Sequence, residues 1–368
     1  MTVPGQRISI LLPDLRGGGA ERISIVLAHE FARAGHQVEF VLRQARGELL
    51  DEARQSFSVV DLDTARVRSV LRKLVTYLRQ RQPDVLLAAM WPLTCIAPVA
   101  SRLAGLRCKV LVSEHGILSA QYKDWGAAHR IALRATTGLG YRLAHRRIGV
   151  SDGVARDMAG LSSMAPDRFD TIYNPVPPRA EPSEAAIAAA EALWNAPPGQ
   201  RLVTVGTMKA VKNHPLLLRA FAQLPRPGAR LMFVGDGSER DALVSLAQEL
   251  GVADRVIFAG FHPDPSPFYR TADLFALSSN YEGFGNVIVE ALSCGTPVVS
   301  TDCPSGPNEI LEGGRYGRLV PVGDEQALAQ AMSDALAAPV DRDALIQRAA
   351  DFAPAIAAQG YLALLDLT

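Results

Sequence analysis

Two glutamates separated by seven residues, Glu282 and Glu290, flank a glycine-containing turn near the middle of the second half of the chain. The turn follows an apolar run over 274–277 and opens a helix, so its backbone amides are expected at a helix N-terminus, where they favour an anion such as phosphate. These amides belong to Phe284, Gly285 and Asn286. The two carboxylates can bracket a ligand and accept hydrogen bonds from its hydroxyl groups. The pattern therefore predicts a site for a phosphorylated ligand that carries hydroxyls.

A second candidate for anion binding is the run Gly17-Gly18-Gly19, placed between the first expected strand and a helix that begins near Ala20. Glycines let the backbone approach a ligand closely, and the helix amides that follow favour a diphosphate. The spacing differs from the dinucleotide fingerprint, because Arg22 stands where the third glycine would fall, and there is no P-loop motif. A nicotinamide or flavin cofactor is therefore disfavoured. A simple tight turn from strand to helix remains the alternative.

Candidate metal ligands are sparse in the sequence. Asp61 and Asp63 form a D-x-D triplet at the end of an expected strand, far in sequence from Glu290, and a structural role is favoured for them. The four cysteines show neither C-x-x-C spacing nor a clustered histidine partner, which indicates reduced thiols of a cytoplasmic protein. We expect no metal site and no disulfide framework.

Short apolar runs alternate with helical patterns along the chain, and the same alternation begins again near residue 202. Strands that are apolar throughout and alternate with helices are typical of parallel sheets covered on both faces. We expect two doubly wound α/β domains over 1–175 and 201–353, joined by a proline-rich linker over 176–200. In open sheets of this kind ligands bind outside the carboxyl ends of the strands, which predicts a cleft between the domains.

The formal net charge is zero, but residues 1–175 carry 24 basic and 16 acidic side chains, whereas 176–368 carry 14 and 22. A helix expected over 66–81 places apolar residues on one arc and six Arg or Lys residues on the other. It fits either an anionic membrane surface or an ordinary helix that covers a sheet. Nucleic acid is a poorer explanation, since no such motif is present and aromatic residues make up only 6%. No export signal is visible, and the longest apolar stretch, 85–100, is too short to cross a bilayer.

The segment E-G-F-G-N-x-x-x-E-A-L-x-x-G-x-P-V-V resembles the E-x7-E motif of a large family of retaining glycosyltransferases, which includes bacterial polysaccharide, lipopolysaccharide and phosphatidylinositol mannosyltransferases. Further segments carry the likeness over nearly the whole chain: 17–21, 150–155, 173–176, 234–237 and 258–261. The resemblance implies the GT-B fold, with two facing Rossmann-like domains, and a final helix over 354–368 that packs on the first domain. It also implies a UDP- or GDP-sugar donor, no required metal and retention at the anomeric carbon.

The same resemblance assigns roles to single residues of the donor site. Glu290 would hold the ribose hydroxyls, and Glu282 the hydroxyls of the donor sugar. The amides of 284–286 would bind sugar and phosphate oxygens, and Phe261 would flank the base. Lys212 matches a lysine that neutralises the diphosphate.

Two further positions are weighed through the resemblance. The family's second cation, an arginine, is Thr207 here, and Lys209 could supply the missing charge if the turn aims it inward. His115, which follows an expected strand over 110–112, resembles the family's active-site histidine. The acceptor would be a glycan, commonly linked to a lipid, and the enzyme would be cytoplasmic, with peripheral attachment to the inner face of the membrane as a further expectation. Rival hypotheses are a nucleotide-sugar epimerase or hydrolase, and a non-catalytic nucleotide-sugar-binding partner.

Overall fold

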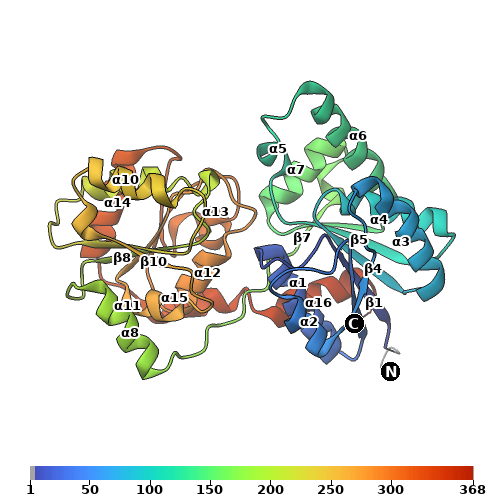
Figure 1. Ribbon diagram of the computed structural model, residues 1–368, viewed down its shortest axis with the longest axis horizontal. Helices are drawn as coiled ribbons and strands as arrows, with labels where there is room; N and C mark the ends of the chain where they lie inside the picture. The colour runs from blue at the N-terminus through green and yellow to red at the C-terminus, as the bar shows by residue number, and fades with distance from the viewer. Residues whose placement is uncertain (1–4, 368) are drawn as a thin grey trace. The chain divides into compact units, whose positions relative to one another are not determined.

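The computed structural model describes residues 5–367 and separates into two compact units. The first unit consists of Met1–Pro177 together with Ala353–Thr368, and the second unit is Pro178–Phe352. Each unit is a parallel sheet with helices on both faces (Figure 1). The doubly wound α/β arrangement expected from the sequence is thus confirmed in each half of the chain.

The first unit holds a seven-stranded sheet in the order β3-β2-β1-β4-β5-β6-β7. Its strands are β1 (Arg7–Leu12), β2 (Gln37–Leu42), β3 (Ser58–Asp61), β4 (Val85–Ala89), β5 (Lys109–Glu114), β6 (Arg146–Gly149) and β7 (Asp170–Thr171). Its helices are α1 (Gly19–Arg33), α2 (Leu50–Ser56), α3 (Val67–Arg81), α4 (Leu93–Ala104), α5 (Leu118–Gln121), α6 (Ala127–Leu143), α7 (Asp152–Ser162) and α16 (Pro354–Leu364), with the 3-10 turn η1 (Pro166–Arg168). The central strands β1 and β4 are almost wholly buried, because their apolar side chains face helices on both sides of the sheet.

The second unit holds a six-stranded sheet in the order β10-β9-β8-β11-β12-β13. Its strands are β8 (Arg201–Val205), β9 (Arg230–Val234), β10 (Val256–Gly260), β11 (Leu274–Leu277), β12 (Val298–Thr301) and β13 (Arg318–Val320). Its helices are α8 (Glu184–Trp194), α9 (His214–Ala222), α10 (Arg240–Glu249), α11 (Ser266–Thr271), α12 (Asn286–Ser293), α13 (Pro307–Ile310), α14 (Glu325–Ala337) and α15 (Arg342–Ala350), with η2 (Ala210–Lys212), η3 (Ala253–Arg255) and η4 (Glu312–Gly314). The order reverses between β8 and β11, and the loops that follow these two strands therefore begin side by side, where open sheets bind ligands.

The C-terminal helix α16 returns to the first unit. It buries Ala357, Ala358, Tyr361 and Leu362 in the same apolar core as Ile23 and Phe31 of α1. The aromatic rings of Phe31 and Tyr361 meet edge to face, with 6.1 Å between their centroids. The final helix is therefore part of the first unit's core, although the second unit precedes it in the chain.

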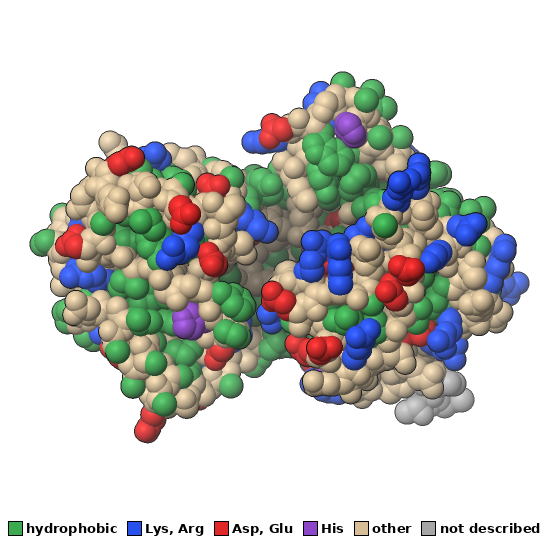
Figure 2. Space-filling model, in the orientation of Figure 1, with side chains coloured by type: hydrophobic (Ala, Val, Ile, Leu, Met, Phe, Trp, Pro, Cys, Tyr) green, Lys and Arg blue, Asp and Glu red, His purple; other side chains and the backbone are tan. Residues whose placement is uncertain are grey.

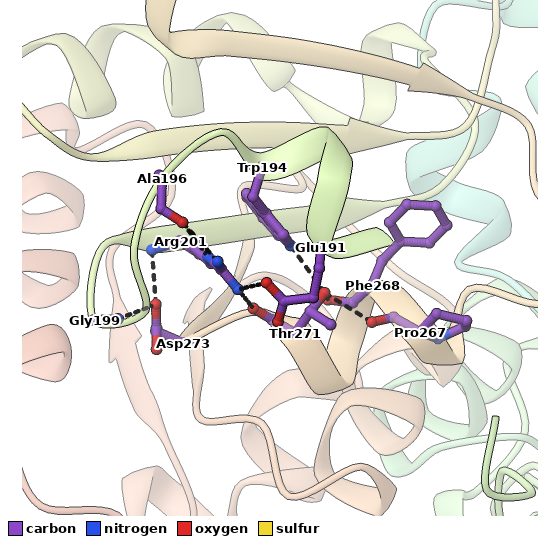
Figure 3. A network of polar contacts seen from close by, with 9 residues as sticks. All are labelled: Glu191, Trp194, Ala196, Gly199, Arg201, Pro267, Phe268, Thr271 and Asp273. Carbon is purple, nitrogen blue, oxygen red and sulfur yellow. Dashed lines mark hydrogen bonds and ion pairs between the residues drawn. The ribbon is translucent and has the colours of Figure 1, made fainter. Parts of the chain in front are cut away.

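The segment expected as a linker, 176–200, is largely part of the second unit. Helix α8 lies within this segment and packs on α11, with Trp194 buried and its indole donating a hydrogen bond of 2.9 Å to Thr271 (Figure 3). Arg201 of β8 pairs with Glu191 at 2.7 Å and donates two hydrogen bonds to the carbonyl of Ala196. The buried Trp194 and the contacts of Arg201 thus hold this helix to the second unit.

Candidate active site

The loops after β8 and β11 bring Lys212 and Glu282 together at the switch point of the second unit. Lys212 Nζ lies 2.7 Å from Glu282 Oε1, and the Ser279 hydroxyl donates to the same oxygen at 2.6 Å. The loops are also joined through the backbone, since the Asn280 amide donates to the carbonyl of Val211 at 2.8 Å. Residues 70 positions apart in the sequence thus form one charged pair, and the side chains of Lys212 and Glu282 are only 19% and 13% exposed.

The backbone of Glu282 is held from its other side by the loop after β12. Its amide donates to the carbonyl of Pro304 at 2.8 Å, and its carbonyl accepts from Ser305 at 3.2 Å. Gly306 has φ +96°, and a Cβ there would lie 1.7 Å from the carbonyl oxygen of Phe284. No residue with a side chain fits at that position without moving the turn. The loop after β12 therefore fixes the turn that precedes α12.

Helix α12 begins at Asn286, and Gly285 precedes it in the left-handed region with φ +100°. Because Gly285 has no side chain, the N-cap residue itself offers no acceptor to the first amides of the helix. Phe284 is buried, and its ring meets that of Phe352 at 5.4 Å. The amides of 284–286 thus lie at the N-terminus of α12, where the sequence predicted them. The buried Phe284 anchors the turn that carries them.

Glu290, one turn into α12, is held by two residues that the sequence did not suggest. Its Oε1 lies 2.6 Å from Arg179 Nη2, and its Oε2 accepts a hydrogen bond of 3.2 Å from the Tyr269 hydroxyl. Burial alone would lower the pKa of Arg179, but the adjacent Glu290 outweighs it and raises that pKa. Burial, followed by the charge of Glu290, raises the pKa of Tyr269 well above its usual value, so that its hydroxyl stays a donor. A carboxylate has about four acceptor positions, so two remain for ligand hydroxyls.

Two other candidates of the second unit lie exposed. Lys209 is solvent-exposed and forms no ion pair within residues 5–367, and Thr207 beside it is exposed as well. Phe261 follows Gly260, which has φ +79°, and its side chain is 62% exposed. An exposed ring after the carboxyl end of a strand is free to stack on a flat ligand. The roles of Lys209 and Phe261 stay predictions.

In the first unit, the three glycines lie in the strand-to-helix turn after β1. Gly17 has φ +92°, Gly18 is the N-cap of α1, and Gly19 is its first residue. The neighbouring loop presses close, since a Cβ at Gly47 would lie 2.1 Å from the carbonyl oxygen of Leu15. The structure thus confirms a tight turn at a helix N-terminus. Anion binding there stays a prediction.

His115 lies directly after β5 in the first unit. Its Nε2 is 3.4 Å from the Ser113 hydroxyl, which in turn is 3.0 Å from the hydroxyl of Tyr361 in α16. Its Nδ1 is buried and has no hydrogen-bond partner among residues 5–367. Burial lowers the pKa of His115 to about 4, and the imidazole is therefore neutral near pH 7 and able to accept a proton or a hydrogen bond.

Glu114, beside His115, is a buried carboxyl that sequence reasoning missed. It accepts hydrogen bonds from the Thr94 hydroxyl at 2.5 Å, from the Tyr141 hydroxyl at 2.9 Å and from the Trp91 amide at 3.1 Å. Burial raises the pKa of Glu114 to about 7 even though these bonds favour the carboxylate. No spacing in the sequence links these residues, since they come from the β4–α4 turn, α4, α6 and β5.

Asp61 and Asp63 form a local turn, in which Asp61 Oδ1 accepts from the Asp63 amide at 2.7 Å. Within residues 5–367, no three His, Cys, Asp or Glu side chains gather as metal ligands would. Local hydrogen bonding accounts for the D-x-D triplet.

Within residues 5–367, no helix is both long and apolar enough to cross a bilayer.

Two family models cover the two halves of the chain. Residues 17–180 match "Glycosyltransferase Family 4" and residues 195–352 match "Glycosyl transferases group 1". The chain is 30% identical over 341 residues to the lipopolysaccharide core biosynthesis glycosyltransferase LpsE of Rhizobium meliloti, with 90% of each chain covered. It is 28% identical to the N-acetylgalactosamine-N,N'-diacetylbacillosaminyl-diphospho-undecaprenol 4-alpha-N-acetylgalactosaminyltransferase of Campylobacter jejuni, over 64% of this chain and 62% of that one. The structure of Anabaena HepE in complex with UDP-glucose has a TM-score of 0.83 at 23% identity, covering 99% of this chain and 100% of that one.

Two doubly wound parallel sheets of this kind, matched over nearly their full length by solved glycosyltransferases, define the GT-B fold. The chain belongs to the family of group 1 glycosyltransferases, as the sequence resemblance implied.

Proposed function

We propose that this glycosyltransferase moves a hexosyl group from a UDP- or GDP-sugar to a hydroxyl of a lipid-linked glycan, with retention at the anomeric carbon, at the inner face of a membrane. The observation that carries the proposal is the Lys212–Glu282 pair beside the turn that opens α12. A cation, a carboxylate and helix amides in one place suit a diphosphate that is joined to a sugar. The relatives named above, one of which acts on a diphospho-undecaprenol glycan, support the choice of acceptor.

Each group has a defined task in this proposal. Lys212 donates to the diphosphate and stabilises the negative charge that grows as it departs, which is the main catalytic work. Glu282 keeps one oxygen on Lys212 and turns Oε2, which makes no hydrogen bond within the described residues, to a hydroxyl of the donor sugar. The amides of 284–286 bind sugar and phosphate oxygens.

Glu290 accepts from the ribose hydroxyls through the positions that Arg179 and Tyr269 leave open. Phe261 stacks on the base, and Lys209 adds positive charge near the diphosphate. In the first unit the turn at 17–19 binds a phosphate oxygen of the donor, and the neutral His115 contacts the donor sugar. The chain needs no metal for this chemistry, because Lys212 and the amides supply the positive field.

The test is turnover with a panel of nucleotide sugars, with and without membrane glycolipid as acceptor. We expect one donor to yield a glycosylated lipid by mass spectrometry, with the anomeric configuration of the donor kept by proton NMR. Release of nucleoside diphosphate without any need for acceptor would instead favour the epimerase or hydrolase hypothesis. Binding without turnover would favour a non-catalytic partner.

A further inference from the structure

The outer face of α6 is apolar and exposed to solvent. The helix buries Leu133, Thr137, Gly140 and Tyr141 against its neighbours, and a Cβ at Gly140 would lie 2.6 Å from the Cα of Cys95 in α4. Five exposed apolar residues follow the opposite face at helical spacing: Ala128, Ile131, Ala132, Ala135 and Leu139. The side chains of Ile131 and Leu139 are 68% and 57% exposed.

An aromatic cluster stands at the N-terminal end of this stripe. The rings of Trp91, Tyr122, Trp125 and His129 follow one another with centroids 5.3 Å, 4.3 Å and 5.2 Å apart. Trp125 and His129 are exposed. Tryptophan and tyrosine are enriched where a protein meets the boundary between lipid and water, because their rings are apolar and their N–H and O–H groups are polar.

The charges around the stripe are almost all positive. Asp124 is the sole acidic residue between Glu114 and Asp152, and α6 contains none. Four exposed cations lie on or beside the helix and pair with no carboxylate in the described part of the chain: Lys123, Arg130, Arg134 and Arg142. In Figure 2, hydrophobic side chains gather over the part of the surface that α5 and α6 form, with Lys and Arg side chains nearby.

Helix α3, the other basic helix, exposes a different set of side chains. It buries Val70, Leu74 and Leu78 in its unit, so that it exposes mainly a charged face. One of its cations is paired with a carboxylate, since Lys73 Nζ lies 3.8 Å from Asp63 Oδ2, whereas Arg130 and Arg142 of α6 donate only to backbone carbonyls within the described residues. Lying in a membrane interface requires apolar side chains to enter the lipid as well as basic ones to meet the headgroups. Of the two helices, only α6 exposes a row of apolar side chains together with cations.

We infer that the stripe of α6 and the aromatic cluster seat the first unit on a bilayer with anionic headgroups. Ile131, Leu139 and Trp125 enter the boundary between headgroups and acyl chains, while the exposed cations Lys123 and Arg134 meet lipid phosphates. The inference rests on the proposed function, since it gives the lipid-linked acceptor a surface from which it reaches the enzyme. It goes further by naming the docking element.

The test is co-sedimentation of the full chain with phosphatidylcholine vesicles, with and without phosphatidylglycerol, at low and high salt. One variant combines Ile131→Gln with Leu139→Gln, and a matched control combines Arg68→Gln with Arg72→Gln on α3. We expect the native chain to prefer the anionic vesicles and the α6 variant to bind them about tenfold or more weakly. The α3 control should bind within about twofold of the native chain.

The inference is overturned if the α6 variant binds vesicles as the native chain does, or if the α3 control alone abolishes binding. It is also overturned if light scattering finds a native dimer that the α6 variant breaks without any loss of vesicle binding, since the stripe would then face a second copy of the chain. Binding of UDP and GDP is measured on the same proteins by calorimetry. Vesicle binding without nucleotide binding would refute the proposed function and leave the docking surface standing. Nucleotide binding without vesicle binding would refute the docking surface and leave the proposed function standing.

Discussion

Replacement of Lys212 by methionine removes the ammonium group and keeps most of the side chain's length. The lost interaction with the departing diphosphate is a charge-assisted hydrogen bond, worth about 1.5–3 kcal/mol, which corresponds to a fall in kcat of roughly 10- to 150-fold. The loss should fall on kcat more than on the KM of the acceptor, because the charge on the diphosphate is largest in the transition state.

The structure also predicts a cost in stability that must be separated from the loss of turnover. Without Lys212, Glu282 keeps the Ser279 hydroxyl but has no cation, and its side chain is only 13% exposed. We expect the stranded carboxylate to cost about 1–3 kcal/mol, less than for a fully buried charge. Adding Glu282→Gln removes that charge, so the double variant should regain stability while its turnover stays low.

The assay is acceptor-dependent release of nucleoside diphosphate, with thermal unfolding measured on each variant. Arg318→Met serves as the control, because it breaks an exposed ion pair with Asp334 in the same unit. If turnover in the double variant recovers together with stability, Lys212 is a structural partner of Glu282 and the catalytic reasoning is refuted. A single variant that keeps native kcat would refute it as well.

Gly306→Ala should sharply weaken nucleotide binding, because its Cβ would meet the carbonyl oxygen of Phe284, whereas Gly313→Ala, also at positive φ but in open space, should leave calorimetric binding unchanged. Lys209→Ala is expected to lower kcat, and full activity in the turnover assay would mean that no cation replaces the family arginine. Burial lowers the pKa of His214 to about 4, below the value of about 6.5 for histidine in an unfolded chain. The unfolded chain therefore binds a proton at His214 at a higher pH than the native chain does. As a result, the free energy of unfolding falls as the pH is lowered from about 6.5 to about 4. His214→Gln should flatten the fall of the thermal midpoint over that range, and an unchanged slope would show that other groups carry it.

The sequence predicted the two sheets because their strands are apolar throughout and are separated by helical periods. The β7 strand was not predicted, because its residues, Asp170 and Thr171, are only two and polar. Helix α8 lies in the segment expected as a linker, and its attachment depends on Arg201 reaching Glu191 and Ala196, contacts that no local pattern encodes.

For the site, the turn before α12 and its two glutamates could be read from the sequence, since glycine and carboxylate spacing is local. The partners of these carboxylates could not. Arg179 lies in a proline-rich segment 111 positions before Glu290, and Tyr269 lies on α11, where it looks like a core aromatic. Glu114 is similar, because its three donors come from elements that only the folded sheet brings together. Buried polar networks depend on tertiary distances, which sequence spacing does not contain.

The central claim is that Glu290 binds the ribose of a nucleoside diphosphate in the second unit. It is tested most directly by calorimetric titration of the native chain and of Glu290→Gln with UDP, GDP and their 2′,3′-dideoxy analogues. The native chain should lose about tenfold or more in affinity when the hydroxyls of the preferred nucleotide are removed, since each hydrogen bond to a charged acceptor contributes roughly 1.5–3 kcal/mol. The Glu290→Gln variant should bind the natural nucleotide weakly and lose little more with the analogue. An equal loss in both proteins, or none in the native chain, would contradict the account.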